Sequence, residues 1–146
     1  MLKHLFDAEL EYRPSMQPLV DSGEGELIGS GDGWVAGPRI EGTLHWTLFE
    51  VPGRLVCSMN PVAVIETGDG ARLELEARGF ARRRSESSRV WVVAATLLLQ
   101  SDDASYAWLN DALAVWQGEF DANAHRARYR AYLMADGAGV PDHKEY

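Results

Sequence analysis

Hydrophobic and polar residues alternate along much of the chain. In residues 5 to 13 one set of alternate positions is apolar and the other is charged; the apolar set is Phe6, Ala8, Leu10 and Tyr12. The same period of two recurs in residues 40–48, 71–78 and 124–134. Because successive side chains of a strand point to opposite faces, each segment is predicted to be a half-buried β-strand.

Glycine and proline separate these segments. Gly68-Asp69-Gly70 is a tight hairpin signal, since Asp-Gly tolerates positive φ. Short strands are predicted at 26–28 and 34–35 around a glycine-rich bend, and longer ones at 55–67 and 112–120. The pattern predicts an all-β fold, a single antiparallel β-barrel of about eight strands without a long helix. It would occupy residues 1–135, followed by a loose tail at 136–146. Such a barrel is filled by side chains or just holds one small ligand.

Residues 90–99 are apolar on both faces. A strand of this kind needs cover on its outer side as well as its inner side. No amphipathic helix is predicted that could supply that cover, so a second subunit is its economical source. The sequence therefore predicts a homodimer.

Composition narrows the partners and the compartment. The chain has 146 residues, enough for one domain, and a formal net charge of −8, which argues against nucleic acid and anionic membranes as partners. No apolar run approaches the roughly 20 residues of a membrane helix, and early charges disfavour a secretory leader, so a cytoplasmic location is expected. Cys57 is the single cysteine and is expected to be a small buried hydrophobe.

Several short motifs occur in a characteristic order. They are Gly37-Pro-Arg-Ile-Glu-Gly42, Gly68-Asp-Gly-Ala71, Arg78-Gly79, Tyr106-Ala-Trp-Leu-Asn110 and Tyr129. In this order the chain resembles domain-of-unknown-function family 3237, a group of small bacterial proteins, over residues 3 to 134. The resemblance implies a compact antiparallel β-barrel and no general assigned activity. Members typically have Asp-Trp after a longer loop where this chain has His45-Trp46, so an imidazole stands in place of a carboxylate.

The segment 106–110 is an irregular corner at the predicted barrel mouth. Trp108 and Asn110 could donate from indole and amide N–H groups to a ligand oxygen. In the alternative, Asn110 satisfies loop backbone groups while the Trp108 indole plugs the barrel end. Asp69 is expected to cap amides within its own turn.

The last predicted strand places His125 and Tyr129 on one face, facing the interior. Four residues apart along the strand, the two lie about 13 Å from one another on that face. They could act as general acid and base around a substrate, or form a hydrogen-bonded pair in the core. Glu66 shares the parity of Val62 and Val64 and could be an interior carboxylate.

The remaining candidates are Arg78, His45 and Trp46. Arg78 has the parity of a polar face and is expected to be exposed or ion-paired, unless it turns inward to anchor a carboxylate. His45 is a candidate acid or base, and Trp46 is expected to contact the ligand. No His-x-His, His-Glu-x-x-His or cysteine pair suggests a metal site, and no phosphate-binding glycine loop suggests a nucleotide cofactor.

Two classes of function remain open. The first is a small-molecule barrel for a compact aromatic or carboxylate-bearing metabolite; as an enzyme it would perform cofactor-free acid-base chemistry such as isomerisation, lyase action or decarboxylation. The alternative is a non-catalytic carrier or an oligomeric assembly module with a packed interior. The second class would be favoured by an interior filled by the tryptophans at 34, 46, 91, 108 and 116.

Overall fold

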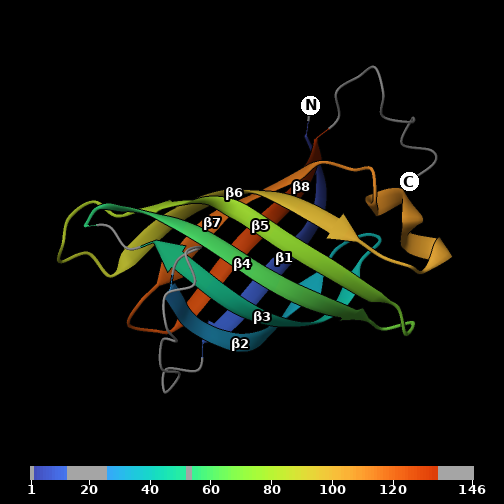
Figure 1. The fold of residues 1–146 in the computed structure, drawn as a ribbon, viewed down its shortest axis with the longest axis horizontal. Helices are drawn as coiled ribbons and strands as arrows, with labels where there is room; N and C mark the ends of the chain where they lie inside the picture. The colour runs from blue at the N-terminus through green and yellow to red at the C-terminus, as the bar shows by residue number, and fades with distance from the viewer. Residues whose placement is uncertain (1, 13–25, 52–53, 135–146) are drawn as a thin grey trace.

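The computed structural model describes residues 2–12, 26–51 and 54–134, which form a closed antiparallel β-barrel (Figure 1). The strands are β1 (Leu2–Tyr12), β2 (Glu26–Ala36), β3 (Glu41–Val51), β4 (Val56–Thr67), β5 (Arg72–Arg82), β6 (Val90–Gln100), β7 (Ala114–Asp121) and β8 (Arg126–Met134). Each strand pairs with its neighbours in sequence, and β8 pairs with β1 to close the barrel. The predicted fold of about eight antiparallel strands is confirmed.

Period-two alternation determines which side chains fill the barrel. On β6, Val93, Leu97 and Leu99 are buried, whereas Val92 and Leu98 face outward and are exposed. On β1 the predicted apolar row points inward, with Phe6 fully buried. Closure pairs both edges of every strand and so removes the open edges on which sheets aggregate.

The glycine-rich segment is not the bend that its composition predicted. Residues 29–33 lie within the continuous strand β2, paired with β1 and β3. A Cβ on Gly31 would lie 1.7 Å from the carbonyl oxygen of Glu11 and 2.9 Å from the Trp46 ring. Glycine is therefore required there by the close approach of backbone and ring, which is a usual meaning of glycine inside a strand.

A short 3-10 helix, η1 (Ala104–Leu109), covers one end of the barrel (Figure 1). Asp103 caps its first turn by accepting a hydrogen bond from the backbone N–H of Ser105. Tyr106 and Leu109 are buried, and the Tyr106 hydroxyl donates to the Asp69 carboxylate in the β4–β5 turn at 3.0 and 3.1 Å. This end is closed by the helix and the hairpin together.

The predicted tail at 136–146, together with residue 135 at its boundary, lies outside the described residues. Within the described part of the chain, no helix has the length and apolar composition needed to cross a bilayer.

Candidate functional site

Aromatic rings gather inside the barrel in the half away from η1. Tyr12, the last residue of β1, lies between Trp46 of β3 and Phe120 of β7. Its ring centroid is 4.4 Å from that of Trp46 and 4.6 Å from that of Phe120, on which it stacks. The three rings offer flat apolar surfaces of the kind on which another ring can stack.

A second aromatic pair lies further along β7 and β8. Trp116 and Tyr129 stack with their centroids 4.4 Å apart and their planes 12° apart. Tyr129 pairs across the sheet with Gly118, where a Cβ would lie 2.9 Å from the Tyr129 Cα. The absence of a side chain at Gly118 lets the two strands approach closely beside this stack.

Two polar groups in this interior have no partner. Among the described residues, Trp46 Nε1 and Trp116 Nε1 are buried and make no hydrogen bond, and the two residues are 4% and 1% exposed. An unsatisfied buried donor costs about 1–3 kcal/mol, so each such group requires an explanation. A ligand or water acceptor inside the barrel would supply it.

The interior is uncharged. Among the described residues, the buried polar or charged side chains are Thr67 and Ser101 only. Burial raises the pKa of the Tyr129 phenol, because a phenolate in an apolar interior would lack solvation. The group is therefore neutral at physiological pH and can act as a hydrogen-bond donor or acceptor.

His125 does not lie in the interior with Tyr129. It is exposed in the β7–β8 turn with φ of 54°, and its carbonyl oxygen accepts a hydrogen bond from Tyr12 N at 2.9 Å. The Asp121 carboxylate accepts from the backbone N–H groups of Asn123 and Ala124, which stabilises this turn and delays the start of β8 to Arg126. The predicted parity therefore applies to Tyr129, which is buried, but not to His125.

His45 and Glu66 lie together on the outer surface. His45 Nδ1 is 2.5 Å from Asp32 Oδ1, and its Nε2 is 3.8 Å from Glu66 Oε1. The inward row of β4 contains Ala63 and Ile65 instead, so the predicted interior position of Glu66 is wrong. Since more than half of each side-chain surface at His45 and Glu66 is in contact with solvent, the group is a surface cluster.

Arg78 also faces outward. Its guanidinium pairs with Glu76 Oε1 at 2.7 Å, and 71% of its side chain is exposed. Arg78 is thus exposed and ion-paired, as its parity predicted, and it does not turn inward to anchor a carboxylate. No cationic side chain among the described residues is buried inside the barrel.

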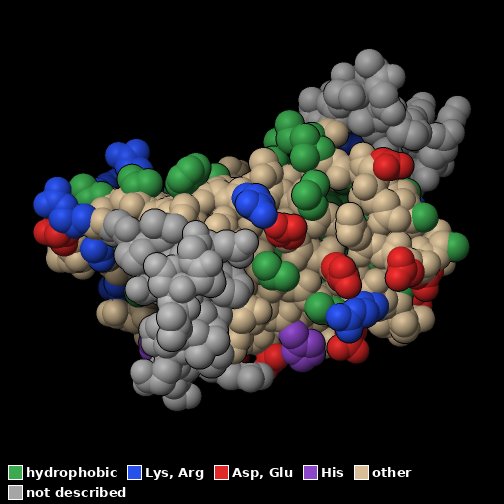
Figure 2. All heavy atoms as spheres, viewed as in Figure 1, with side chains coloured by type: hydrophobic (Ala, Val, Ile, Leu, Met, Phe, Trp, Pro, Cys, Tyr) green, Lys and Arg blue, Asp and Glu red, His purple; other side chains and the backbone are tan. Residues whose placement is uncertain are grey.

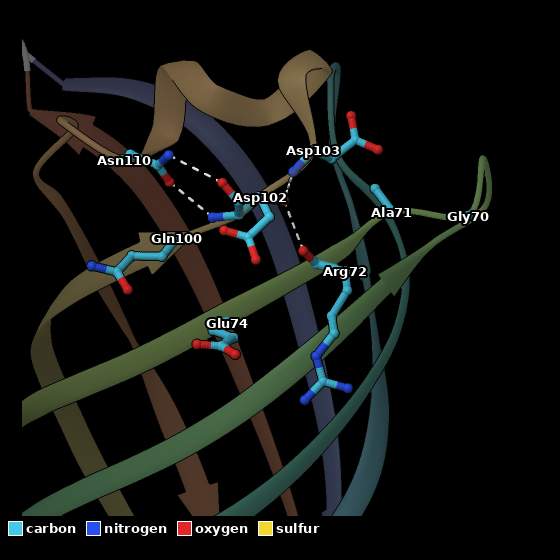
Figure 3. Close-up of a pocket in the computed structure, with 9 residues that line it drawn as sticks. Gly70, Ala71, Arg72, Glu74, Gln100, Asp102, Asp103 and Asn110 are labelled. Carbon is cyan, nitrogen blue, oxygen red and sulfur yellow. Dashed lines mark hydrogen bonds between the residues drawn. The ribbon is translucent and has the colours of Figure 1, made fainter.

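The corner at Trp108 and Asn110 has a structural arrangement. Asn110 Oδ1 accepts from Ser101 N at 2.8 Å, and Asn110 Nδ2 donates to the Ser101 carbonyl at 3.1 Å (Figure 3). Trp108 is partly buried against the core, with the Arg39 guanidinium 4.1 Å from its ring centroid. The geometry therefore matches the alternative in which Asn110 satisfies loop backbone groups and Trp108 covers the barrel end.

A hollow of about 560 Å³ lies on the outside of this corner. Arg72, Glu74, Gln100 and Asp102 line it with Asn110, and in Figure 3 the Arg72 side chain extends away from the Asn110 amide. The charged and amide side chains that line it, including Arg72, Glu74 and Gln100, are exposed. Among the described residues, no group of three or more His, Cys, Asp or Glu side chains is placed to hold a metal ion.

Sequence reasoning did not single out Tyr12 and Phe120 and treated Trp116 only as filling. A usable signal was present. Each of these aromatic residues lies on the inward-facing row of its strand, and Tyr12 and Phe120 lie near strand ends at the same end of the barrel. Trp46 was the predicted ligand contact that does lie in this cluster. Of the other tryptophans, Trp34 is exposed on the outer surface, and Trp91 and Trp108 are partly buried.

Comparison with known proteins supports the fold. A β-barrel-like protein from Acinetobacter baumannii is 18% identical and superposes with a TM-score of 0.77, over 92% of this chain and 96% of that one. A conserved protein of unknown function from Rhodopseudomonas palustris is 18% identical, with a TM-score of 0.75 over 91% and 96%. A protein from Penicillium herquei described as an enzyme is 21% identical, with a TM-score of 0.59 over 92% and 94%.

These crystal structures establish likeness of fold only, since their sequences are so distant. No protein-family model matches the chain, and no curated protein matches it. The resemblance to domain-of-unknown-function family 3237 stays a prediction.

Proposed function

We propose that the protein binds a compact, neutral aromatic compound with hydrogen-bond acceptors inside the barrel, in the half away from η1. The observation that supports this most is the pair of unpartnered indole donors, Trp46 Nε1 and Trp116 Nε1. A carbonyl, ether or phenol oxygen of a ligand would accept from them and relieve the energetic cost of their burial.

The surroundings favour a neutral ligand over a carboxylate. The interior presents aromatic faces at Tyr12, Phe120 and Trp116 but, among described residues, no buried cation. A carboxylate moved into such a site without a partner would lose its hydration and gain no compensating charge. Arg78, which could have anchored an anion only by turning inward, is paired with Glu76 on the outer surface.

Binding is better supported than acid-base catalysis. Of the proposed catalytic residues only Tyr129 lies inside the barrel. Burial raises the pKa of its phenol and so makes it a weaker acid, and no buried charged side chain among the described residues is available as a base. The likeness to the Penicillium herquei enzyme keeps catalysis as the second candidate. In that case Tyr129 would donate a proton to a ligand oxygen, and Tyr129→Phe would abolish turnover while leaving binding largely intact.

A thermal-shift screen tests the proposal. Neutral aromatic carbonyl compounds and phenols are compared with aromatic carboxylates of the same ring size. A ligand present at 100 times its Kd stabilises the folded state by about 2.7 kcal/mol. For a domain of this size that raises Tm by about 10 °C. We expect stabilisation by neutral compounds and none by the matched carboxylates.

Variants identify the site. Trp116→Phe and Trp46→Phe each remove one indole donor and should weaken binding by about 5- to 30-fold, the equivalent of one buried hydrogen bond. Trp34→Phe, on the exposed outer surface, is the matched control and should bind as the native protein does. The proposal fails if a ligand binds equally to all three variants, or if carboxylates bind in preference to neutral compounds.

A further inference from the structure

The outer surface of the barrel has two unlike faces. On β1 and β8, Arg126, Arg128 and Arg130 form ion pairs with acidic residues of β1. On β4, β5 and β6, large apolar side chains are exposed instead, including Phe80 at 64% and Val92 at 59%. Figure 2 shows hydrophobic side chains along the upper edge of the view, where β6 runs in Figure 1, and acidic ones gathered toward the η1 end.

We propose that the face formed by β4, β5 and β6 binds a second copy of this chain through a two-fold axis. This inference is independent of the proposed ligand. The outward residues at its centre are Val56, Ser58, Asn60 and Val62 on β4; Glu76, Arg78, Phe80 and Arg82 on β5; and Val92, Ala94, Thr96 and Leu98 on β6. On each strand, the outermost two of these residues lie equally far from a central line and are of matching type, either both apolar or of opposite charge.

The centre of the pattern is a line across the sheet. Met59 pairs with Gly79, and Gly79 pairs with Ala95, so these three residues lie side by side on neighbouring strands. A two-fold axis along this line would exchange the two ends of each strand. Every outward residue would then face the residue equally far from the line on the other side, as an isologous interface requires.

The charges match under this rotation. On β5, Arg82 of one copy would face Glu76 of the other, and the same pair forms twice. Arg78 would lie against Phe80 of the second copy, where a guanidinium over an aromatic ring is favourable. Arg78 and Glu76 already pair within one chain at 2.7 Å, so the second copy's Arg82 would complete a three-membered cluster.

The apolar residues match as well. Val92 would face Leu98 of the second copy on β6, and Val56 would face Val62 on β4. All four side chains are exposed in the isolated chain. The outward residues nearest the centre of the face on β6 are the small residues Ala94 and Thr96, which allow the two copies to approach closely there. Large apolar side chains thus meet large apolar side chains, and opposite charges meet.

The face also has room for the contact. A groove of about 450 Å³ begins at Arg78 and Phe80 on β5 and continues over β6 to Val115 on β7, and Phe80 of the second copy, which lies against Arg78, would enter its β5 end. The residues that face one another run from 76 to 82 on β5 and from 92 to 98 on β6, seven positions or about 23 Å, and three strands make the face about 14 Å wide. This flat area of about 320 Å², increased by the relief of the side chains, is smaller than the about 800 Å² per partner of a standard interface, so the dimer should be a weak one.

Sedimentation velocity of the full chain between about 1 and 100 µM tests the proposal, since a dimer of this size should dissociate in the micromolar range. Arg82→Glu and Glu76→Arg each place like charges opposite one another and should raise the dimer Kd about tenfold or more. Combining both substitutions restores opposite charges in the reversed order and should return Kd to within about threefold of the native value. Arg72→Glu, on the same strand but beyond the face, is the matched control.

The outcomes divide clearly. Weakening by each single substitution, recovery in the double variant and no effect of the control support the two-fold contact. A chain that stays monomeric throughout leaves the face to a different partner and overturns the proposal. A dimer that is insensitive to both single substitutions, or that the double variant fails to restore, overturns it too. Circular dichroism of each variant verifies that the barrel is folded.

Discussion

The Asn110 side chain should stabilise the fold and not bind a ligand. Its amide forms two hydrogen bonds with the Ser101 backbone, at 2.8 and 3.1 Å. Ser101 is buried, whereas Asn110 is exposed and lines the hollow, so truncating Asn110 leaves the Ser101 N–H and carbonyl with only water from the hollow as a partner. Losing such bonds costs about 1–3 kcal/mol, and we expect Asn110→Ala to lower the free energy of unfolding by about 2 kcal/mol.

Urea denaturation followed by tryptophan fluorescence measures this change. With an m-value of about 2 kcal/mol/M, a loss of 2 kcal/mol lowers the midpoint by about 1 M. Asp111→Ala changes the exposed next residue and should stay within about 0.5 kcal/mol of the native protein. An Asn110→Ala variant as stable as the Asp111→Ala control would refute the reasoning, and it would return the Asn110 amide to the candidates for ligand binding.

Three further predictions concern the turn, the interior phenol and the close strand contact. Hydrogen bonds from Thr67 and Tyr106 hold the pKa of Asp69 below its usual range, so the stability that the ionised carboxylate contributes is lost as pH falls below about 4. Asp69→Asn should therefore flatten the low-pH part of a curve of unfolding free energy against pH. Burial raises the pKa of Tyr129, so the unfolded chain loses this proton first and stability falls as pH rises above about 10. Tyr129→Phe should reduce that loss in urea titrations at alkaline pH. An unchanged dependence of the unfolding free energy on pH would contradict this. Gly31→Ala places a Cβ 1.7 Å from the Glu11 carbonyl oxygen and should lower Tm by several degrees, whereas alanine at the exposed Gly68, where nothing lies within 4 Å, should have little effect.

The fold could be predicted because its determinants are local. Alternation in β1, β5 and β8 places one row of each strand inside, and the Gly68-Asp69-Gly70 turn sets a hairpin. The β2 strand was broken in two by the prediction, since glycine usually signals a bend. Its glycines are needed for a contact with Trp46 and the neighbouring backbone, and that contact exists only in the closed barrel.

The site was harder to predict, because it depends on where each strand begins and on which of its two faces points into the barrel. His125 lies one residue before β8, and Asp121 stabilises the turn that contains it. Glu66 lies on the outward row of β4. The sequence of residues 62–66 does not show which row points inward, because both rows are largely apolar. The aromatic cluster of Tyr12, Trp46 and Phe120 joins strands that lie far apart in sequence, so its members could not be grouped without the barrel closure.

Proton–nitrogen correlation spectra of the tryptophan indole groups test the central claim most directly. The chain has five tryptophans, so each indole N–H can be assigned with single Trp→Phe variants. Adding a neutral aromatic compound that stabilises the protein should shift the Trp46 and Trp116 signals downfield, as expected when a free donor gains an acceptor, while the signal of exposed Trp34 stays in place. If the Trp46 and Trp116 signals do not move when the compound binds, the ligand is not held by these donors and the proposed interior site is wrong.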